Sequence, residues 1–399
     1  MERRARRIFP KGHFPGFWRA GAPPGRRVCY VVGVARILID LRMVRGRLHG
    51  IARYALELAR RLPVLAPELS FMGLTAPEGL PPGLGNLTPA IPLHRARAGF
   101  LDALKEQATL LVDLLELKPD LFHATSFSVP ALWTGRLVAT LHDANHLALP
   151  ENYSPVHSVY YRLIVGPRAR RASALLTVSE FSREELARHL DLTPYRFQVI
   201  APGVDERYRP PTPSEARAFI QRRHLPARYL AAVGNTKAHK NLGLLAKLAP
   251  ELPVPIVLLA GKGAAKELGF PETTVELTEL PEEEMPLFYG AAAGLLLPSR
   301  YEGFGLPALE AMASGCPVLA SNVTSLPEVT GKAAVLLPPE EPGAWREAAL
   351  RLLRDDAQQR ALAELGRERA LRYTWDDCAR HTLAVYRRVL EKPVQGLKR

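Results

Sequence analysis

The sequence predicts an α/β protein with two domains, each built around a sheet of parallel strands. Short apolar runs alternate with amphipathic helical segments along most of the chain, which is the pattern of repeated βαβ units. The chain has 399 residues, of which 47% are hydrophobic, and this is enough for two globular domains with separate cores. Three prolines in residues 208–216 interrupt the alternation and indicate a linker between two series of elements.

The first series begins with a strand at 36–40 and a helix at 50–62. The apolar residues Ile51, Tyr54 and Leu58 recur at helical spacing, so this helix can bury one face. The remaining elements are strands at 121–124, 137–141, 174–178 and 197–200 and helices at 158–170 and 182–189. Residues 34–208 therefore form the predicted N-terminal domain.

The second series follows the linker and has the same alternation. It contains strands at 229–233, 254–260, 274–277, 292–297, 318–320 and 334–337, a loop at 331–334, and helices at 343–355 and 356–372. Residues 209–375 form the predicted C-terminal domain. Residues 376–399 are the predicted C-terminal crossover helix and tail: a helix at 375–390 is long enough to cross back onto the first domain.

The first 33 residues lack the periodicity of a helix or a strand. They hold eight Arg or Lys residues and one Glu, and no apolar segment suited to a signal peptide. Two interpretations remain open: a disordered basic arm that touches anionic lipid head groups, or an extension upstream of a true translation start near Val34. We favour the second, because a domain of this type normally opens directly on its first strand.

Charge and cysteine content argue against several function classes. The formal charge is +13, but seven of these charges lie in residues 1–33, and the remainder lacks aromatic–basic interleaving or zinc-finger spacing. Nucleic acid is therefore not an expected partner. The three cysteines, Cys29, Cys316 and Cys378, are too few for a disulfide framework, which indicates a reducing cytoplasmic compartment. No apolar run approaches the roughly 20 residues of a membrane-spanning helix.

The segment Tyr301–Glu310 carries the strongest functional signal. It follows an apolar run that predicts a buried strand, contains a glycine-rich turn, and leads into a helix with Pro307 at its first position and Gly315 just past its end. Free backbone N–H groups and the dipole at such a helix start favour a phosphate. Glu302 and Glu310 flank this anion site and can accept hydrogen bonds from sugar hydroxyls, so the segment predicts a nucleotide-sugar site.

Six segments, in this order, carry a resemblance to a known family: Gly50–Tyr54, Leu141–Asp143, Val178–Ser182, Pro202–Asp205, Val233–Asn241 and Pro298–Pro317. Together they resemble the retaining glycosyltransferases of the GT-B fold, in family 4 (glycosyl transferases group 1), which contains bacterial mannosyl- and glucosyltransferases. The resemblance covers nearly all of residues 34–392. Single segments are weak signals, whereas their order and spacing together are highly specific.

The resemblance implies two Rossmann-like domains that face a central cleft, the first on the acceptor side and the second binding the nucleotide sugar. It implies a metal-independent, retaining hexosyltransferase that needs no cofactor. The expected reaction moves mannose from GDP-mannose to a glycan or lipid-linked acceptor in polysaccharide biosynthesis. UDP-glucose or another UDP-sugar is the alternative donor. A GT-B epimerase or phosphorylase and a non-catalytic binder are two further candidate functions, and the intact motif residues argue against both.

The resemblance also gives individual residues a role. Glu310 would bind the ribose hydroxyls and Glu302 those of the donor sugar, while Lys240 would neutralise the departing diphosphate and His142 would lie beside the reacting centre. His142, Lys240 and Glu302 are therefore the predicted catalytic residues, and no residue is expected to bind a metal. The remaining predicted donor-binding residues are Gly50, Gly234, Asn235, Asn241, Gly303, Phe304, Gly305 and Leu306.

Several of these residues also have an ordinary structural interpretation. Lys240 can be a surface lysine and His142 a structural histidine. Gly50 and its neighbours would form the first-domain loop that faces the diphosphate, but Arg53 can instead be a charge on a helix surface. Ser179 and Ser182 can have a role near the donor or can simply cap the following helix. The sequence alone leaves both interpretations open for each residue.

The implied chemistry is front-face transfer with retention. The acceptor hydroxyl attacks from the side on which the diphosphate leaves, and the leaving phosphate oxygen takes its proton. Lys240, the loop amides and the helix dipole would stabilise the leaving group. Many members of the family carry an arginine where this chain has Asn235, with Lys237 close by, so the sequence leaves open how the phosphates are fully neutralised.

We expect a cytoplasmic protein with a possible peripheral contact at the inner membrane face. A basic, partly amphipathic region of the first domain would make this contact and bring the enzyme to a lipid-linked acceptor. Charged helix faces are usually only solvated, which is the competing interpretation. The region contains Arg60, Arg61, Arg162, Arg168, Arg170 and Arg171.

Overall fold

The computed structural model describes residues 34–46, 49–81, 91–97 and 103–392. The basic segment 1–33 lies outside the described residues, so both interpretations of it stay predictions. From Val34 onward the chain forms one compact unit, and every contact described below lies inside that unit.

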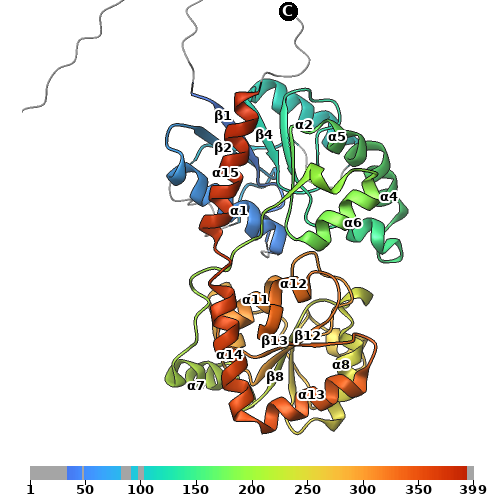
Figure 1. Ribbon diagram of the computed structural model, residues 1–399, viewed down its shortest axis with the longest axis vertical. Helices are drawn as coiled ribbons and strands as arrows, with labels where there is room; N and C mark the ends of the chain where they lie inside the picture. The colour runs from blue at the N-terminus through green and yellow to red at the C-terminus, as the bar shows by residue number, and fades with distance from the viewer. Residues whose placement is uncertain (1–33, 47–48, 82–90, 98–102, 393–399) are drawn as a thin grey trace, which may run out of the picture. The chain divides into compact units, whose positions relative to one another are not determined.

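The first domain contains a parallel sheet of seven described strands in the order β3-β2-β1-β4-β5-β6-β7 (Figure 1). Its strands are β1 (Arg36–Asp40), β2 (Ser70–Thr75), β3 (Leu93–Arg95), β4 (Leu121–Ala124), β5 (Arg136–Thr140), β6 (Ala174–Thr177) and β7 (Phe197–Val199). Its helices are α1 (Gly50–Leu65), α2 (Ala103–Leu117), α3 (Asn145–Ala148), α4 (Pro155–Tyr160), a π-helical turn (Tyr161–Val165), α5 (Gly166–Arg171) and α6 (Glu180–Leu190). Apart from the exposed edge strand β3, the strands are largely buried, because helices cover both faces of a parallel sheet.

The second domain contains a parallel sheet of six described strands in the order β10-β9-β8-β11-β12-β13. Its strands are β8 (Leu230–Val233), β9 (Ile256–Leu259), β10 (Val275–Glu276), β11 (Gly294–Leu297), β12 (Val318–Ser321) and β13 (Ala334–Leu337). Its helices are α7 (Pro213–Arg222), α8 (Leu242–Leu248), α9 (Ala264–Glu267), α10 (Met285–Gly290), α11 (Leu306–Ala313), α12 (Leu326–Thr330), α13 (Pro342–Arg354) and α14 (Asp356–Ala370). The fold is thus α/β with two Rossmann-like domains, as predicted.

The last helix, α15 (Trp375–Glu391), belongs to the first domain although it follows the second in sequence. It packs along α1, as Figure 1 shows, and its Trp375, Leu383 and Tyr386 are part of the same buried cluster as Tyr54 of α1. The predicted crossing of the C-terminal helix onto the first domain is therefore confirmed.

The two chain segments that connect the domains are hydrogen-bonded to each other. Val204 N–H donates to the carbonyl of Tyr373 at 3.0 Å. A Cβ on Gly203 would lie 2.0 Å from the backbone nitrogen of Trp375, so this close approach of two backbones requires glycine.

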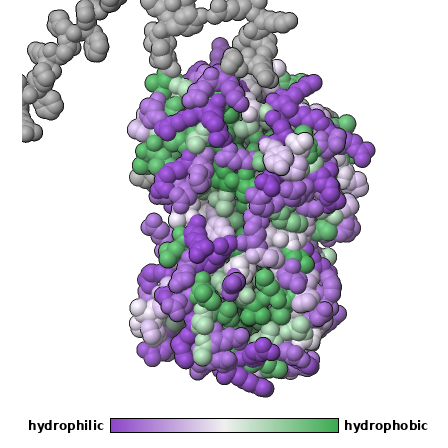
Figure 2. Space-filling view, in the orientation of Figure 1, coloured by the Kyte–Doolittle hydropathy of each residue, from purple (hydrophilic) through white to green (hydrophobic). Residues whose placement is uncertain are grey.

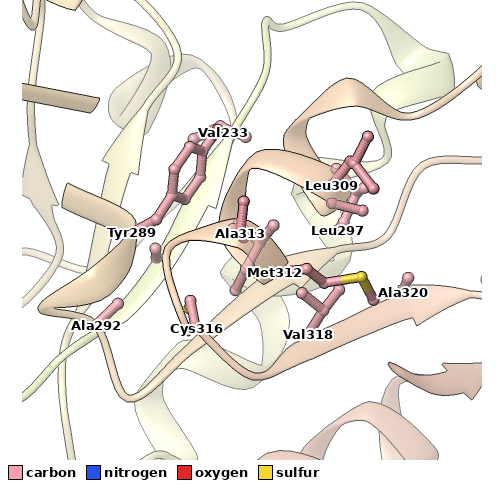
Figure 3. Close-up of a cluster of buried hydrophobic side chains, with 14 of the residues drawn as sticks. Val233, Tyr289, Ala292, Leu297, Leu309, Met312, Ala313, Cys316, Val318 and Ala320 are labelled. Carbon is pink, nitrogen blue, oxygen red and sulfur yellow. The ribbon is translucent and has the colours of Figure 1, made fainter. Parts of the chain in front are cut away.

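Helix α11, which carries the predicted glutamate motif, rests on the core of the second domain. Figure 3 shows Leu309 and Met312 of this helix among Leu297 of β11 and Val318 and Ala320 of β12. All five side chains are almost completely buried. Such packing fixes the rotation of the helix, and with it the direction of the polar residues on its other face.

Three local predictions differ from the structure. The helix expected over 158–170 is divided into α4, the π-helical turn and α5, with Pro155 and Pro167 in the first turns of the two α-helices. The proline-rich linker is shorter than predicted, because Thr212 and Glu215 form a capping box that starts α7. The loop at 331–334 is a 3₁₀ turn that ends where β13 begins.

Candidate functional site

A cavity of about 920 Å³ is lined by residues of both domains. Ten of the predicted site residues lie in its wall: Gly50, His142, Gly234, Lys240, Glu302, Gly303, Phe304, Gly305, Leu306 and Glu310. The structure therefore brings together most of the residues that the sequence pattern selected. Asn235 and Asn241 are not in the wall among the described lining residues.

The glycine-rich turn and the start of α11 form one side of this cavity. Gly305 precedes the helix with a φ of 101°, and a Cβ there would lie 2.7 Å from Leu326 Cδ2, so both backbone and packing require glycine. Pro307 is the second helical residue, one position later than predicted. Gly315 follows the helix end with a φ of 75°, as expected for a glycine at that place.

Side chains from two directions hold the turn in place. Ser179 and Ser182 of the first domain both donate hydrogen bonds to the carbonyl of Gly303, at 2.6 and 2.9 Å. Ser325 of the second domain donates to the carbonyls of Glu302 and Phe304, at 2.8 and 2.9 Å. Ser179 also accepts from the backbone of Ser182 at 3.0 Å as the cap of α6, so the capping interpretation of Ser179 is confirmed.

Lys240 and Glu302 meet in the cavity. Lys240 Nζ lies 2.7 Å from Glu302 Oε1, and the two side chains are only 19% and 10% exposed. Lys240 is therefore an enclosed lysine and not a surface one. Asp143 of the first domain is close to both: burial and Glu302 raise the pKa of its carboxyl, and Lys240 opposes them.

His142 lies two residues after the end of β5 and lines the cavity. Its Nε2 lies 2.9 Å from the carbonyl of Thr125, and because a carbonyl only accepts, Nε2 carries the hydrogen and Nδ1 is an acceptor. The ring of Tyr54 meets the imidazole edge-on with centroids 4.9 Å apart. Burial lowers the pKa of His142 to about 4, and nearby His49 adds to this effect, so the imidazole is neutral near pH 7.

Glu310 lies one helical turn below the glycine-rich turn. Burial raises the pKa of its carboxyl to about 7, opposed by Arg53 and by a hydrogen bond from Tyr289. The Tyr289 hydroxyl donates to Glu310 Oε2 at 3.3 Å, and Arg53 Nε lies 4.0 Å from Oε1. Glu310 can therefore change its protonation state in the physiological pH range.

The two asparagines selected by the sequence hold structure near the site. Asn241 adopts a φ of 53° and donates from its side chain to the carbonyls of Pro298 and Pro339, at 3.1 and 2.8 Å. Asn235 is exposed, and its side-chain oxygen accepts from the backbone of Lys237 at 3.1 Å. Contact of either residue with a donor stays a prediction.

Sequence reasoning missed part of the cavity wall. Arg53 is only 6% exposed, which rules out its interpretation as a helix-surface charge. Tyr208, Glu282 and Tyr289 also line the cavity and were not predicted. The available signal was weak: Arg53 follows Gly50 by three residues and so shares its face of α1.

Several of the six basic residues expected to touch a membrane are paired or buried. Arg60 and Arg61 are paired with Glu57 on their own helix, and Arg168 is buried. Arg162, Arg170 and Arg171 are exposed. No helix in the described part of the chain combines the length and the hydropathy of a membrane span.

Two family descriptions match the chain in succession. "Glycosyltransferase Family 4" matches residues 48–208, and "Glycosyl transferases group 1" matches residues 215–369. The first corresponds to the sheet with β1 to β7 and the second to the sheet with β8 to β13.

Proteins similar over almost the full length include two mannosyltransferases. O-antigen chain mannosyltransferase B of Escherichia coli is 29% identical over 88% of this chain and 99% of its own. MMP alpha-(1->4)-mannosyltransferase of Mycolicibacterium hassiacum is 28% identical over 89% of this chain and 98% of its own.

The fold recurs in solved glycosyltransferase structures. HepE of Anabaena, solved in complex with UDP and glucose, superposes with a TM-score of 0.71 at 18% identity and covers 89% of this chain and 100% of its own. At this identity the likeness concerns the fold alone. Taken with the two family matches and the mannosyltransferase relatives, the chain belongs to the group 1 and family 4 glycosyltransferases with the GT-B fold.

Proposed function

We propose that this glycosyltransferase moves a hexose from a nucleotide diphosphate sugar to a glycan or lipid-linked acceptor, and that the hexose is mannose. The configuration at the anomeric carbon is retained in this proposal. The observation that carries the proposal is the Lys240–Glu302 pair, 2.7 Å apart and enclosed beside the glycine-rich start of α11. The pair places a cation that can bind a diphosphate directly beside a carboxylate that can bind sugar hydroxyls.

In the proposed complex the donor would lie in the cavity along α11. The diphosphate would lie at the N-terminal end of the helix, where the backbone N–H groups of its first turn favour an anion. The ribose diol would then reach Glu310, one turn further along, and the sugar would extend toward Glu302 and His142. Lys240 has three N–H donors, so it can keep Glu302 and still bind a phosphate oxygen.

The residues support a front-face transfer. The bond between the anomeric carbon and the β-phosphate oxygen breaks, and the acceptor oxygen forms its bond on the same face. The acceptor proton moves to the leaving phosphate oxygen. Lys240 and the start of α11 stabilise the negative charge of that diphosphate. The neutral His142, with Nδ1 as an acceptor, can hold a hydroxyl near the reacting carbon.

The leading donor is GDP-mannose, because two relatives similar over nearly the whole chain are mannosyltransferases. A UDP-sugar is the alternative, since HepE, of the same fold, was solved with UDP and glucose. Isothermal titration with GDP, UDP and ADP, followed by turnover with GDP-mannose and UDP-glucose, separates these donors. NMR of the anomeric proton in the product tests retention. Product of inverted configuration, or no binding of any nucleotide, would overturn the proposal.

A peripheral membrane contact remains part of the proposal for a lipid-linked acceptor. Helix α4 and the turn after it expose three apolar side chains, Val156, Val159 and Leu163, which are 61%, 54% and 67% exposed. Arg162 lies among them on the surface. Exposed apolar residues are ordinary on protein surfaces, and hydrophobic areas also interrupt the mainly hydrophilic face in Figure 2. Flotation with anionic liposomes at low and high salt, for the wild type and Val159→Glu, tests this contact.

A further inference from the structure

Arg53 joins the first domain to two carboxylates of the second. It is carried by α1, and its Nη2 donates to Glu282 Oε2 in the turn before α10. Its Nε lies 4.0 Å from Glu310 Oε1. Nε and Nη2 form one edge of the planar guanidinium, so a single edge of Arg53 serves both carboxylates. The Arg53 side chain is only 8% exposed.

The surroundings of Glu310 explain why this cation matters. Arg53 faces Glu310 from α1, Glu282 from the turn before α10, Tyr289 from α10 and Tyr208 from the segment that links the domains. Arg53 and Glu310 stabilise each other's charged forms, while Glu282 opposes the charge on Glu310. Without Arg53, two carboxylates would face one another in an enclosed space, where like charges are costly.

The same helix also meets α11 one turn earlier. A Cβ on Gly50 would lie 3.3 Å from Leu306 Cδ1, the residue at which α11 begins. Gly50 and Arg53 are three residues apart on α1, and Leu306 and Glu310 are four apart on α11. Residues three or four apart lie on one face of a helix. The first turns of α1 and α11 therefore contact each other at two successive levels, Gly50 with Leu306 and Arg53 with Glu310. In this register of the two domains Arg53 reaches Glu310.

We propose that Arg53 is a positioning residue for the donor nucleotide: its guanidinium, supplied by the first domain, directs the Glu310 carboxylate of the second domain toward the ribose diol. This inference rests on the proposed function, in which Glu310 binds the ribose. It makes the grip on the nucleotide depend on contact between the domains, through one side chain that need not touch the nucleotide itself.

The test compares two nucleotides that differ only in the diol. Isothermal titration of the full chain gives the dissociation constants of GDP and of 2′,3′-dideoxy-GDP. The value for the dideoxy nucleotide divided by the value for GDP is the ratio that measures recognition of the two hydroxyls. If the wild type prefers UDP, UDP and 2′,3′-dideoxy-UDP replace them. We expect Arg53→Met to reduce this ratio by about tenfold while affinity for the dideoxy nucleotide changes little, and Arg53→Lys to restore part of it.

The matched control is Arg61→Met on the same helix. Arg61 is also paired with two carboxylates, Glu57 and Asp376, and it is not part of the donor cavity wall. We expect it to leave the ratio unchanged. A purely structural role of Arg53 would weaken both nucleotides equally and keep the ratio, and this result would overturn the inference.

A second variant covers the case in which Arg53→Met does not fold. Glu282→Gln removes the carboxylate that competes for the same guanidinium edge, so the ratio should stay the same or rise. A fall in the ratio would contradict the inference.

Glu310→Gln separates this inference from the proposed function. If it leaves the ratio unchanged, the assignment of Glu310 to the ribose fails, and the proposed function fails with it. If Glu310→Gln lowers the ratio and Arg53→Met does not, only the inference about Arg53 fails.

Discussion

The hydroxyl of Tyr386, on the helix that crosses back to the first domain, lies 2.6 Å from Nδ1 of His123 in the strand β4. His123 Nε2 in turn lies 2.8 Å from the Thr140 hydroxyl, and that hydroxyl lies 3.1 Å from the hydroxyl of Tyr54. Tyr54 is the ring that packs on His142. A buried chain of polar contacts thus leads from the C-terminal helix to the cavity.

Tyr386→Phe tests this chain of contacts. The variant leaves one nitrogen of His123 without its partner in a fully buried place, and such a loss costs about 1–3 kcal/mol of unfolding free energy. Burial lowers the pKa of His123 to about 3, so the histidine stays neutral near pH 7 and protonation does not relieve the loss of the hydrogen bond. Urea unfolding followed by circular dichroism measures the change. Equal stability of the two proteins would show that the contact contributes nothing.

Lys240 and Glu302 should be needed for turnover and not for folding. Lys240→Ala removes the proposed cation of the diphosphate, and the loss of one such electrostatic contact typically lowers kcat by about 10² to 10³. Glu302→Gln keeps the shape but not the charge, and a comparable loss is expected. Steady-state transfer assays measure both effects. Lys247→Ala, an exposed lysine of α8, is the control, and full activity of the Lys240 variant would refute the assignment.

Nucleotide binding should depend on pH through Glu310. Its pKa is raised to about 7, and only the ionised carboxylate offers all its acceptors to a diol, so affinity for GDP or UDP should rise from pH 6 to pH 8. Glu310→Gln should abolish this dependence. Titration calorimetry at several pH values, with buffers of different ionisation enthalpy, checks the linked proton release.

The Glu310 carboxyl should also make folding stability depend on pH, and its contribution to stability should fall as the pH rises. The native Glu310 carboxyl has a pKa of about 7, above that of a glutamate in the unfolded chain, so between these two values the native state holds more protons than the unfolded state. Its contribution to stability is therefore present at low pH and falls as the pH rises toward 7. We expect Glu310→Gln to raise the Tm relative to the wild type at pH 8, with a smaller difference at pH 5. A lower Tm at pH 8 would contradict this.

Gly303 should not tolerate a side chain. A Cβ there would lie 2.8 Å from Asp143 Cβ and 3.0 Å from the carbonyl oxygen of His142, so Gly303→Ala forces apart the turn and the first domain. Overpacking of this kind costs about 1–3 kcal/mol, and activity should fall as well. Gly243→Ala is the control: nothing lies within 4 Å of its Cβ position in α8. Thermal unfolding and transfer assays distinguish the two variants.

The transfer should not need a metal ion. In the proposed mechanism Lys240 and the start of α11 meet the charge of the leaving diphosphate, so activity should persist after dialysis against EDTA. Restoration of lost activity by Mg²⁺ or Mn²⁺, in enzyme that EDTA had inactivated, would show that this prediction is wrong.

The strands of both sheets were predictable because buried parallel strands appear as continuous apolar runs. The bounds of β4 and β13 match the prediction residue for residue. β2 was missed because Gly73 interrupts its apolar run, and β3 because it is a three-residue strand at the sheet edge with little burial. Short edge strands carry too few residues for a period to emerge.

The candidate site was predictable where its residues are close in sequence. Glu302 and Glu310 were found because one strand–turn–helix segment carries both. Arg53 was not, because its partner Glu282 is 229 residues away and only the packing of two domains brings them together. For Asn241 the sequence showed the motif but not the contacts. Its two hydrogen bonds to Pro298 and Pro339 could not be predicted, because they join segments far apart in the sequence.

The position of α15 has a consequence for synthesis on the ribosome. Trp375, Leu383 and Tyr386 fill the core against α1, yet they are translated only after the whole second domain. The first domain can therefore start to fold early, but its apolar face along α1 stays uncovered while the whole second domain, from α7 to α14, emerges. Domains usually fold in the order in which they are made. Here the domain that is made first can be completed only after the second has been made, and a nascent chain stalled before Trp375 should be a target for chaperones.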